Sequence, residues 1–346
     1  MSDRRNSRIT FYRIYVDEDS MTNVLHVNQH ELIQSSYLDA YSTITIPNLS
    51  AAKNLQKLEV SVDEVSNITV IVDADTVRDM NRLSDIHIEG TEIIGDISRL
   101  AVPDLRKLVL IDNLVTDSNL DDLLQSLAKN SNRLSVLVIK DFRSDDEEPV
   151  RLTDSLNNLM DLTELEITDS GLSGPIPDLY NLYTLIDLDL SHNNLTGSIP
   201  STISNLVSLR TLDLSHNRLT GSLPESMKSM SNLFHVKLQY NQLSGQFPNN
   251  IIDSLPELWQ IDLSNNPDIE GEISVRLRDR GYRTVTIYVG NTGAVLTEDY
   301  AEYLESMPTK TVYVYEISPD DDYDRIDVDS DEEYYSDEDY YDVADY

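Results

Sequence analysis

The 346-residue sequence contains no cysteine, which excludes disulfides, a thiol nucleophile and a cysteine-ligated zinc site. A chain without cysteine fits a reducing compartment, so we expect a cytoplasmic protein, with a nuclear location also open. The N-terminus carries early charges but no apolar run of signal-peptide length, so we predict neither a signal peptide nor secretion. No stretch approaches the length of apolar residues that a membrane-spanning helix needs.

Basic residues are also scarce. The chain has 26 Lys and Arg against 62 Asp and Glu, which gives a net charge of -36. Long-range repulsion therefore disfavours nucleic acid and acidic membrane surfaces as partners. The same charge favours basic proteins.

Catalytic motifs are missing as well. The sequence has no G-x-x-x-x-G-K-[ST], no G-x-S-x-G and no H-E-x-x-H. His192 and His216 lie 24 residues apart, but repetition of one sequence unit explains the spacing without a metal. We therefore expect no catalytic residue, no cofactor and no bound metal. An enzyme hidden in the irregular N-terminal third stays as an alternative.

What the sequence does have is an internal repeat. The pattern L-x-x-L-x-L recurs five times at spacings of 23 to 25 residues, and more loosely on both sides. In each L-x-L the two leucines face inward on a short strand and the residue between them faces out. The clear copies begin at Leu162, Leu185, Leu209, Leu233 and Leu258, and the looser ones at Tyr41, Leu55, Leu83, Leu105, Leu134 and Tyr282.

One segment between two copies favours a helix. Residues 112–133 carry leucines at helical spacing after a possible Asp or Ser cap. A helix there explains the longer spacing between the copies at Leu105 and Leu134. The leucines of this pattern are Leu120, Leu123, Leu124 and Leu127.

The copies "LDLSHNNLTGSIP" (188–200) and "LDLSHNRLTGSLP" (212–224) resemble the plant-type leucine-rich repeat, LxxLxLxxNxLxGxIP. The resemblance implies an α/β solenoid, with a curved parallel sheet on the concave face. It implies short helices, 3-10 turns and polyproline II segments on the convex side. It also implies a buried structural ladder of asparagines, formed by Asn193, Asn217, Asn241 and Asn266.

We expect four regions. Residues 1–40 form an N-terminal cap, with a strand pair from "RITFYRIYV" and "NVLHV". Residues 41–290 form the solenoid, which is strongest over 155–275. Residues 291–315 form a C-terminal cap with a last strand in "TKTVYVYEI", and residues 316–346 form a disordered acidic tail.

The outward strand positions of the clear copies are the candidate binding face. Many of them are acidic, so they predict a patch that attracts a basic partner. A solvated face with the contacts elsewhere is the other interpretation. The candidates are Glu164, Glu166, Asp187, Asp189, Asp213, His235, Lys237, Gln260 and Asp262.

The tail holds fifteen acids, one base and six tyrosines. It is interpreted as a solubilising segment, as a docking segment for basic proteins, or as a target of acid-directed kinases at Ser330 and Ser336. Asp327, Asp329, Asp331 and Glu338 have the spacing of a calcium loop, but Glu332 stands where that loop requires glycine.

These patterns predict a non-enzymatic protein-interaction scaffold, monomeric, that binds a basic protein through the concave face, the tail or both. Two alternatives stay open. One is a receptor- or inhibitor-like ectodomain, which the plant-type resemblance implies. The other is an acidic-tailed, nuclear chaperone-like binder of basic proteins.

Overall fold

The computed structural model describes residues 14–16, 23–28, 43–46, 54–61, 69–77, 80–115, 120–144, 150–275, 284–297 and 312–315. The chain divides into two compact units. The first consists of residues 1–173 and 179–185, and the second of residues 174–178 and 186–346. The predicted tail, with Ser330, Ser336 and the calcium-loop spacing, lies outside the described residues.

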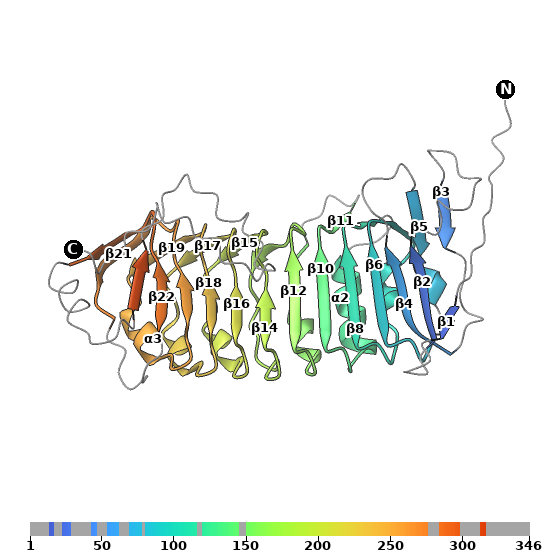
Figure 1. Cartoon of the computed structure of the whole chain (residues 1–346), viewed down its shortest axis with the longest axis horizontal. Helices are drawn as coiled ribbons and strands as arrows, with labels where there is room; N and C mark the ends of the chain where they lie inside the picture. Colours follow the sequence, from blue (N-terminus) through green and yellow to red (C-terminus); the bar gives the residue numbers. More distant parts are fainter. Residues whose placement is uncertain are drawn as a thin grey trace, which may run out of the picture. The chain divides into compact units, whose positions relative to one another are not determined.

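The main sheet of the first unit has the order β1-β2-β4-β6-β8-β10-β12 (Figure 1). β1 pairs antiparallel with β2, and β2 pairs parallel with β4, which confirms the predicted N-terminal strand pair. Every later pair in this unit is parallel. The strands are β1 (Ile14–Val16), β2 (Asn23–Asn28), β4 (Leu55–Ser61), β6 (Asp85–Glu89), β8 (Lys107–Ile111), β10 (Val136–Lys140) and β12 (Glu164–Thr168).

The repeat pattern explains this register. Leu108 of β8 pairs with Leu137 of β10, and Leu137 pairs with Leu165 of β12. All three are almost fully buried, because equivalent leucines of successive coils stack on the inner side of the sheet. A coil here means one repeat unit.

A second sheet of the first unit has the order β11-β9-β7-β5-β3. The prediction that the faint copy at Tyr41 continues the main sheet was wrong. Its Thr43–Ile46 segment is β3, which pairs with β5 of the second sheet, because β2 already occupies the main-sheet edge of β4. The strands are β3 (Thr43–Ile46), β5 (Thr69–Asp73), β7 (Glu92–Ile94), β9 (Leu114–Val115) and β11 (Arg143–Ser144).

The predicted helix is confirmed as α2 (Leu120–Asn130), which lies behind β8 and β10 (Figure 1). Its four leucines are buried, and they hold the helix to the inner side of the sheet. The possible cap residues before it lie outside the described residues. Other coils of this unit use 3-10 turns instead: η1 (Ala74–Val77), η2 (Ile97–Leu100) and η3 (Asp154–Asn158).

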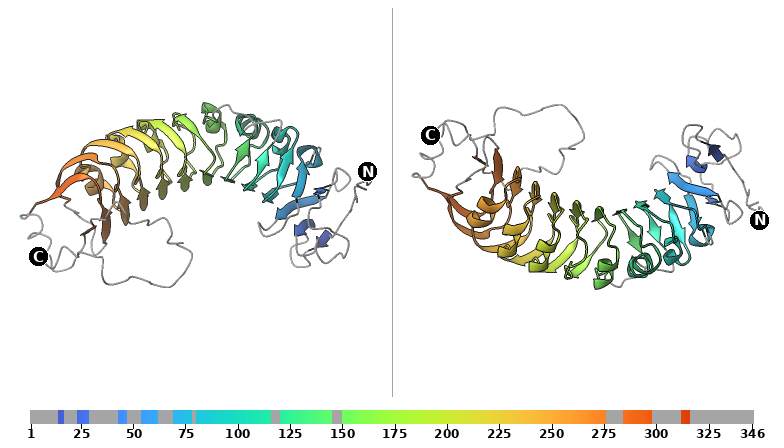
Figure 2. Two further views of the ribbon diagram at one scale, coloured as in Figure 1. Left: turned by 90° about the horizontal axis from the view of Figure 1, so that it is seen from above. Right: turned by 90° about the horizontal axis from the view of Figure 1, so that it is seen from below.

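The main sheet of the second unit has the order β14-β16-β18-β20-β22-β24, all parallel. Figure 2 shows these strands as one layer, with short turns and α3 (Asn249–Ser254) on the opposite side. The predicted last strand is confirmed as β24. The strands are β14 (Asp187–Asp189), β16 (Thr211–Asp213), β18 (His235–Lys237), β20 (Gln260–Asp262), β22 (Val285–Tyr288) and β24 (Val312–Tyr315).

The register predicted for the copy at Tyr282 was wrong by two residues. Ile287 of β22 pairs with Ile261 of β20, whereas the predicted register aligned Ile287 with Leu263. Val285, Ile287 and Val289 alternate and are all buried. Because either register buries alternate residues, the pattern alone could not choose between them.

The G-x-I-P segments form the return of each coil. Gly197 and Gly221 have φ of 77° and 76°, a region that residues with a Cβ rarely adopt. Pro200 and Pro224 precede the 3-10 turns η4 (Ser201–Asn205) and η5 (Glu225–Ser229). A second sheet runs along these returns and contains β13 (Ser173–Pro175), β15 (Asn194–Gly197), β17 (Arg218–Gly221), β19 (Gln242–Gln246), β21 (Asp268–Ile273) and β23 (Gly293–Leu296).

Buried asparagines connect successive coils of the second unit. The Asn217 Oδ1 accepts the Leu195 N–H at 2.9 Å, and its Nδ2 donates to the Leu190 carbonyl at 2.9 Å. Asn241 and Asn266 make the equivalent bonds one and two coils further on. Polar side chains therefore satisfy backbone groups that the turn of each coil leaves without a strand partner.

Candidate binding face on the main sheet

All nine predicted binding residues belong to strands of the two main sheets, at outward positions. Strand alternation turns the leucines inward and the residues between them outward. Glu164 and Glu166 belong to β12 of the first unit, and the other seven belong to β14, β16, β18 and β20 of the second unit. Of these residues, Asp187 is exposed, Asp213 is buried at 6 % exposure, and the others are half-buried.

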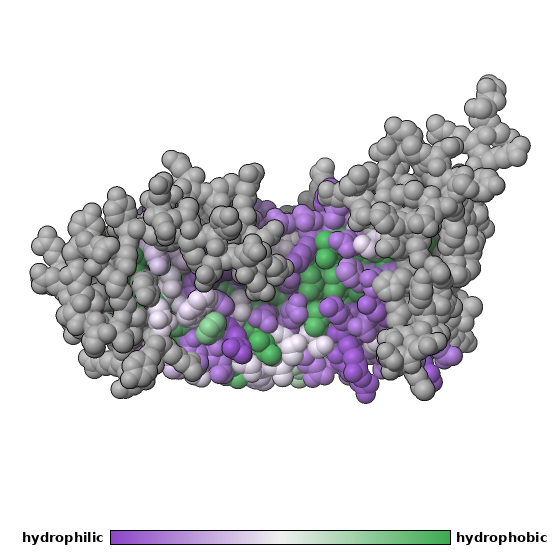
Figure 3. Space-filling model, viewed as in Figure 1, coloured by the Kyte–Doolittle hydropathy of each residue, from purple (hydrophilic) through white to green (hydrophobic). Residues whose placement is uncertain are grey.

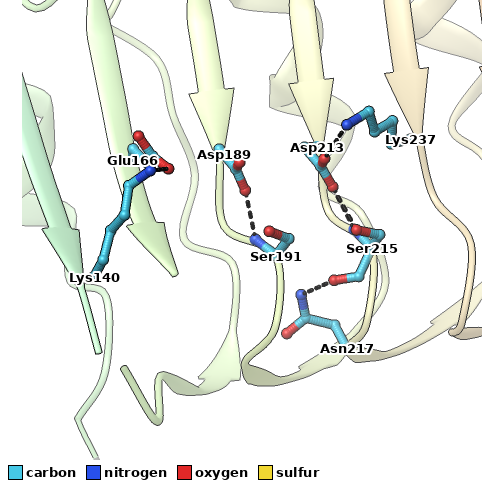
Figure 4. Close-up of polar contacts among 8 residues, drawn as sticks. All are labelled: Lys140, Glu166, Asp189, Ser191, Asp213, Ser215, Asn217 and Lys237. Carbon is cyan, nitrogen blue, oxygen red and sulfur yellow. Dashed lines mark hydrogen bonds and ion pairs between the residues drawn. The ribbon is translucent and has the colours of Figure 1, made fainter. Parts of the chain in front are cut away.

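In the first unit, two acidic groups of this face, Glu166 and Glu59, have lysine neighbours. The Lys140 Nζ lies 2.5 Å from Glu166 Oε1 (Figure 4). On β4, the Lys57 Nζ lies 2.8 Å from Glu59 Oε2. The carboxylate of Glu166 is therefore partly neutralised by the chain itself.

In the second unit, the repeated aspartates bind their own backbone. Asp189 and Asp213 each accept the N–H of the serine two residues later, at 2.9 and 3.0 Å (Figure 4). Asp262 accepts the Ser264 N–H in the same way, at 2.9 Å. The Ser215 hydroxyl also donates to Asp213 Oδ1 at 2.6 Å. The aspartate of each copy thus closes a local turn. Its carboxylate is already hydrogen-bonded within the chain, so it is less available to a partner.

Asp262 shows the cost of placing such a carboxylate in the sheet. Burial raises its pKa, and the nearby Asp213 adds to this rise. The hydrogen bonds from Ser264 and the charge of Lys237 oppose the rise. The ionised form of Asp262 is therefore disfavoured by its surroundings, and a nearby cation stabilises it.

The coil of β18 departs from its neighbours. Lys237 stands where β16 and β20 have aspartate, and its Nζ lies 3.3 Å from Asp213 Oδ2 (Figure 4). Gln239 follows where they have serine, and its buried Oε1 has no hydrogen-bond partner among the described residues. Burial lowers the pKa of His235, and the charges of Lys237 and Arg210 lower it further.

A row of large side chains lies just before these strands, which sequence reasoning did not single out. We name Ile186, Arg210, Phe234 and Trp259 the edge row. Backbone hydrogen bonds join the four residues in order. The Arg210 N–H donates to the Ile186 carbonyl at 2.8 Å, the Phe234 N–H to the Arg210 carbonyl at 2.7 Å, and the Trp259 N–H to the Phe234 carbonyl at 2.9 Å. Trp259 is 46 % exposed and Ile186 37 %. The signal was present, because each member directly follows the first leucine of its copy.

Aromatic contacts organise the edge row. The rings of Phe234 and Trp259 stack with centroids 5.8 Å apart. The Arg210 guanidinium carbon lies 5.8 Å from the Phe234 centroid. His235 packs edge-on against both rings, at 4.7 Å from Phe234 and 5.2 Å from Trp259.

Three of the equivalent positions of the first unit are small and hydroxylic, Ser84, Ser135 and Thr163, and the other two hold Gln56 and Arg106. The Ser84 hydroxyl donates to the Gln56 carbonyl at 3.1 Å, and the Ser135 hydroxyl to the Arg106 carbonyl at 3.0 Å. Thr163 donates to the Ser135 carbonyl in the same way. A serine or threonine therefore suffices at this position, and the coil itself does not require the aromatic residues of the edge row.

The first unit has a different outward feature. Figure 3 shows hydrophobic residues gathered over β8 and β10 on the main-sheet face. Val109 and Val138 pair there and are 5 % and 7 % exposed. These valines cover one another and offer little free surface, so the edge row is the stronger candidate.

The two repeated histidines lie one above the other, as their spacing predicts. The rings of His192 and His216 stack at 4.1 Å, and Tyr240 continues the stack at 4.3 Å. All three residues have positive φ, between 50° and 54°. Within the described residues, no cluster of three or more His, Cys, Asp or Glu could hold a metal ion.

In the described part of the chain, no helix has the length and apolar character needed to cross a membrane.

Comparisons with known proteins place this architecture. A family model described as "Leucine rich repeat" matches residues 161–219. No curated protein matches the chain.

Solved structures share the fold. The ectodomain of the receptor kinase GASSHO1/SCHENGEN3 from Arabidopsis thaliana is 23 % identical, with a TM-score of 0.60, over 85 % of this chain and 35 % of that one. The Arabidopsis receptor kinase HAESA is 25 % identical, with a TM-score of 0.60, over 80 % and 43 %. An internalin from Listeria monocytogenes is 18 % identical, with a TM-score of 0.56, over 86 % and 80 %. The chain spans about two fifths of the length of the GASSHO1/SCHENGEN3 ectodomain and of HAESA.

Proposed function

We propose that this chain, which is a leucine-rich repeat protein, is a non-enzymatic scaffold that binds a basic protein partner. The partner contacts the exposed main-sheet face of the second unit, where the edge row and the β18 coil lie. One observation carries the proposal: Trp259 is 46 % exposed at a position where three coils of the first unit fold with serine or threonine and no described coil of that unit has an aromatic residue.

Large aromatic side chains and arginine dominate the binding energy of protein interfaces. The edge row places Arg210, Phe234 and Trp259 on adjacent coils, and parallel strands lie about 4.8 Å apart. Arg210 and Trp259 are therefore about 10 Å apart, and the three side chains form a continuous surface of that length. Trp259 is also the only tryptophan of the chain.

The basic character of the partner follows from charge. The chain carries a net charge of -36, and Asp187 is exposed beside the edge row residue Ile186. Such a surface steers a positively charged protein toward it. The acidic tail adds to this attraction in the proposal, and the scaffold works as a monomer in the cytoplasm or nucleus.

A receptor-like ectodomain is the second candidate, and the structural likeness favours it. The HAESA structure contains the peptide hormone IDA and the co-receptor SERK1, so a chain of this fold binds polypeptide partners in that protein. On this alternative the ligand is a secreted peptide, and capture from a cytosolic extract fails.

The test is affinity capture with the full chain, followed by mass spectrometry, from cytosolic and from secreted extracts at physiological salt. Trp259→Ala is compared with Tyr180→Ala, a control of matched exposure at 45 % in the first unit. The proposal expects a basic protein in the cytosolic extract, bound by the wild type and by Tyr180→Ala but not by Trp259→Ala. Equal capture by all three chains contradicts it.

A further inference from the structure

We infer that the exposed end of the edge row, the Trp259 indole with the Phe234 ring beside it, binds an arginine side chain of the basic partner. This inference rests on the proposed function, because it names the group by which the partner is recognised.

The row already contains one such contact. The guanidinium carbon of Arg210 lies 5.8 Å from the centroid of Phe234, which is within the range of a cation–π interaction. Phe234 in turn stacks on Trp259 with an interplanar angle of 17°. The two rings thus lie nearly parallel along the row, and tryptophan is the better cation acceptor of the two.

The charges around Trp259 suit a cation. His235 packs against the indole at an interplanar angle of 76°, and its lowered pKa keeps it neutral near pH 7. Lys237 is held by Asp213 at 3.3 Å. Asp262, three residues after Trp259, has a pKa raised by burial, so an approaching cation stabilises its charged form.

The existing cation of the row does not block a second one. Arg210 lies two coils from Trp259, a separation of about 10 Å. This equals about one Debye length at 0.1 M salt, so the repulsion between two exposed cations is largely screened.

The geometry favours arginine over lysine. A guanidinium is planar and weakly hydrated, and it stacks on aromatic faces, whereas an ammonium group keeps its hydration shell.

Because Trp259 is the only tryptophan, its fluorescence reports directly on this site. The probe is a short synthetic peptide in which arginine alternates with serine and glycine. Two matched peptides replace arginine by lysine or by citrulline, which keeps the shape of arginine without its charge. Each peptide is titrated into the full chain at physiological salt, with tryptophan emission and acrylamide quenching as readouts.

The expected result is a shift in Trp259 emission and protection from acrylamide with the arginine peptide. The lysine peptide binds about fivefold more weakly in this readout, and the citrulline peptide has no effect. Phe234→Leu keeps the reporter and weakens arginine-peptide binding by about fivefold. Tyr180→Leu, an exposed control outside the row, leaves it unchanged.

Trp259→Phe guards against a folding artefact, because it keeps an aromatic face. In calorimetric titrations, Trp259→Phe still binds the arginine peptide more tightly than the lysine peptide, whereas Trp259→Leu does not. The two variants have equal melting temperatures. Equal emission changes with all three peptides, or binding that leaves Trp259 unaffected, overturns the inference. If Trp259→Ala still loses the natural partner in that case, the proposed function stands and the row binds by apolar contact instead.

Discussion

Replacing Asn217 by leucine tests the buried ladder most directly. Asn217 is 7 % exposed, and its Oδ1 accepts the Leu195 N–H at 2.9 Å. Leucine has a similar volume and no polar atom, so it removes the hydrogen bonds without leaving a large cavity.

The size of the stability loss depends on which hydrogen bonds the former partners of Asn217 retain. Nδ2 of Asn217 donates to the carbonyls of Leu190, Leu214 and Ser215. Each of these carbonyls also accepts from a second donor, respectively Asn193 Nδ2, Asn241 Nδ2 and the His192 N–H. The Leu195 N–H has no such second partner among the described residues. One unsatisfied buried donor costs about 1–3 kcal/mol, so we expect a loss of about 2 kcal/mol in the free energy of unfolding.

The assay is urea unfolding of the full chain, followed by far-ultraviolet circular dichroism. Asn194→Leu is the matched control, because Asn194 is an exposed asparagine of the preceding coil. We expect a lower midpoint for Asn217→Leu and an unchanged midpoint for Asn194→Leu. If both variants unfold at the wild-type midpoint, the side-chain bonds of the ladder do not stabilise the coils and the reasoning is refuted.

Three further predictions concern other parts of the chain. Asp262 has a raised pKa in the folded protein, so its contribution to stability is fully present below its unfolded pKa and is lost as the pH rises through the folded pKa. The melting temperature of the wild type relative to Asp262→Asn should therefore fall as the pH rises above about 4, the ordinary aspartate pKa, and a constant difference contradicts the shift. Gly221→Ala should destabilise the fold by about 1 kcal/mol, since φ is 76° there, as measured by thermal unfolding against Ser222→Ala. Removing residues 316–346 should leave cooperative unfolding intact, and its loss would show that the tail is structural.

Much of the fold could be predicted from the repeat. The period placed Leu108, Leu137 and Leu165 in one buried column, and the helical spacing of four leucines predicted α2. These signals are local, because the periodicity of a strand or of a helix face can be recognised within a few residues of sequence. The N-terminal strand pair could be predicted because the first coil needs a cap.

The errors arose where two pairings bury the same residues. The segment at Thr43–Ile46 alternates as a main-sheet strand does, yet β2 takes its place beside β4. The copy at Tyr282 fits two registers, and only the pairing of Ile261 with Ile287 decides between them. Strand alternation has a period of two, so a shift by two residues leaves the buried pattern unchanged.

The candidate site shows the same division. The sequence places Glu166 and Asp213 on an outward face, but only the structure shows that Lys140 and Lys237 lie against them. Consensus aspartates look like a charged surface until their bonds to Ser191, Ser215 and Ser264 are seen.

By itself, the sequence determined the repeat period, the inward leucines, the asparagine column and the net charge of -36, because each is a property of residue identity and spacing. Only the tertiary structure decided which strands are neighbours, which acids are already paired, and that Arg210, Phe234 and Trp259 form one row. These three residues are separated by 24 and 25 positions in the chain. They meet because backbone hydrogen bonds between coils bring equivalent positions to within one strand spacing of each other.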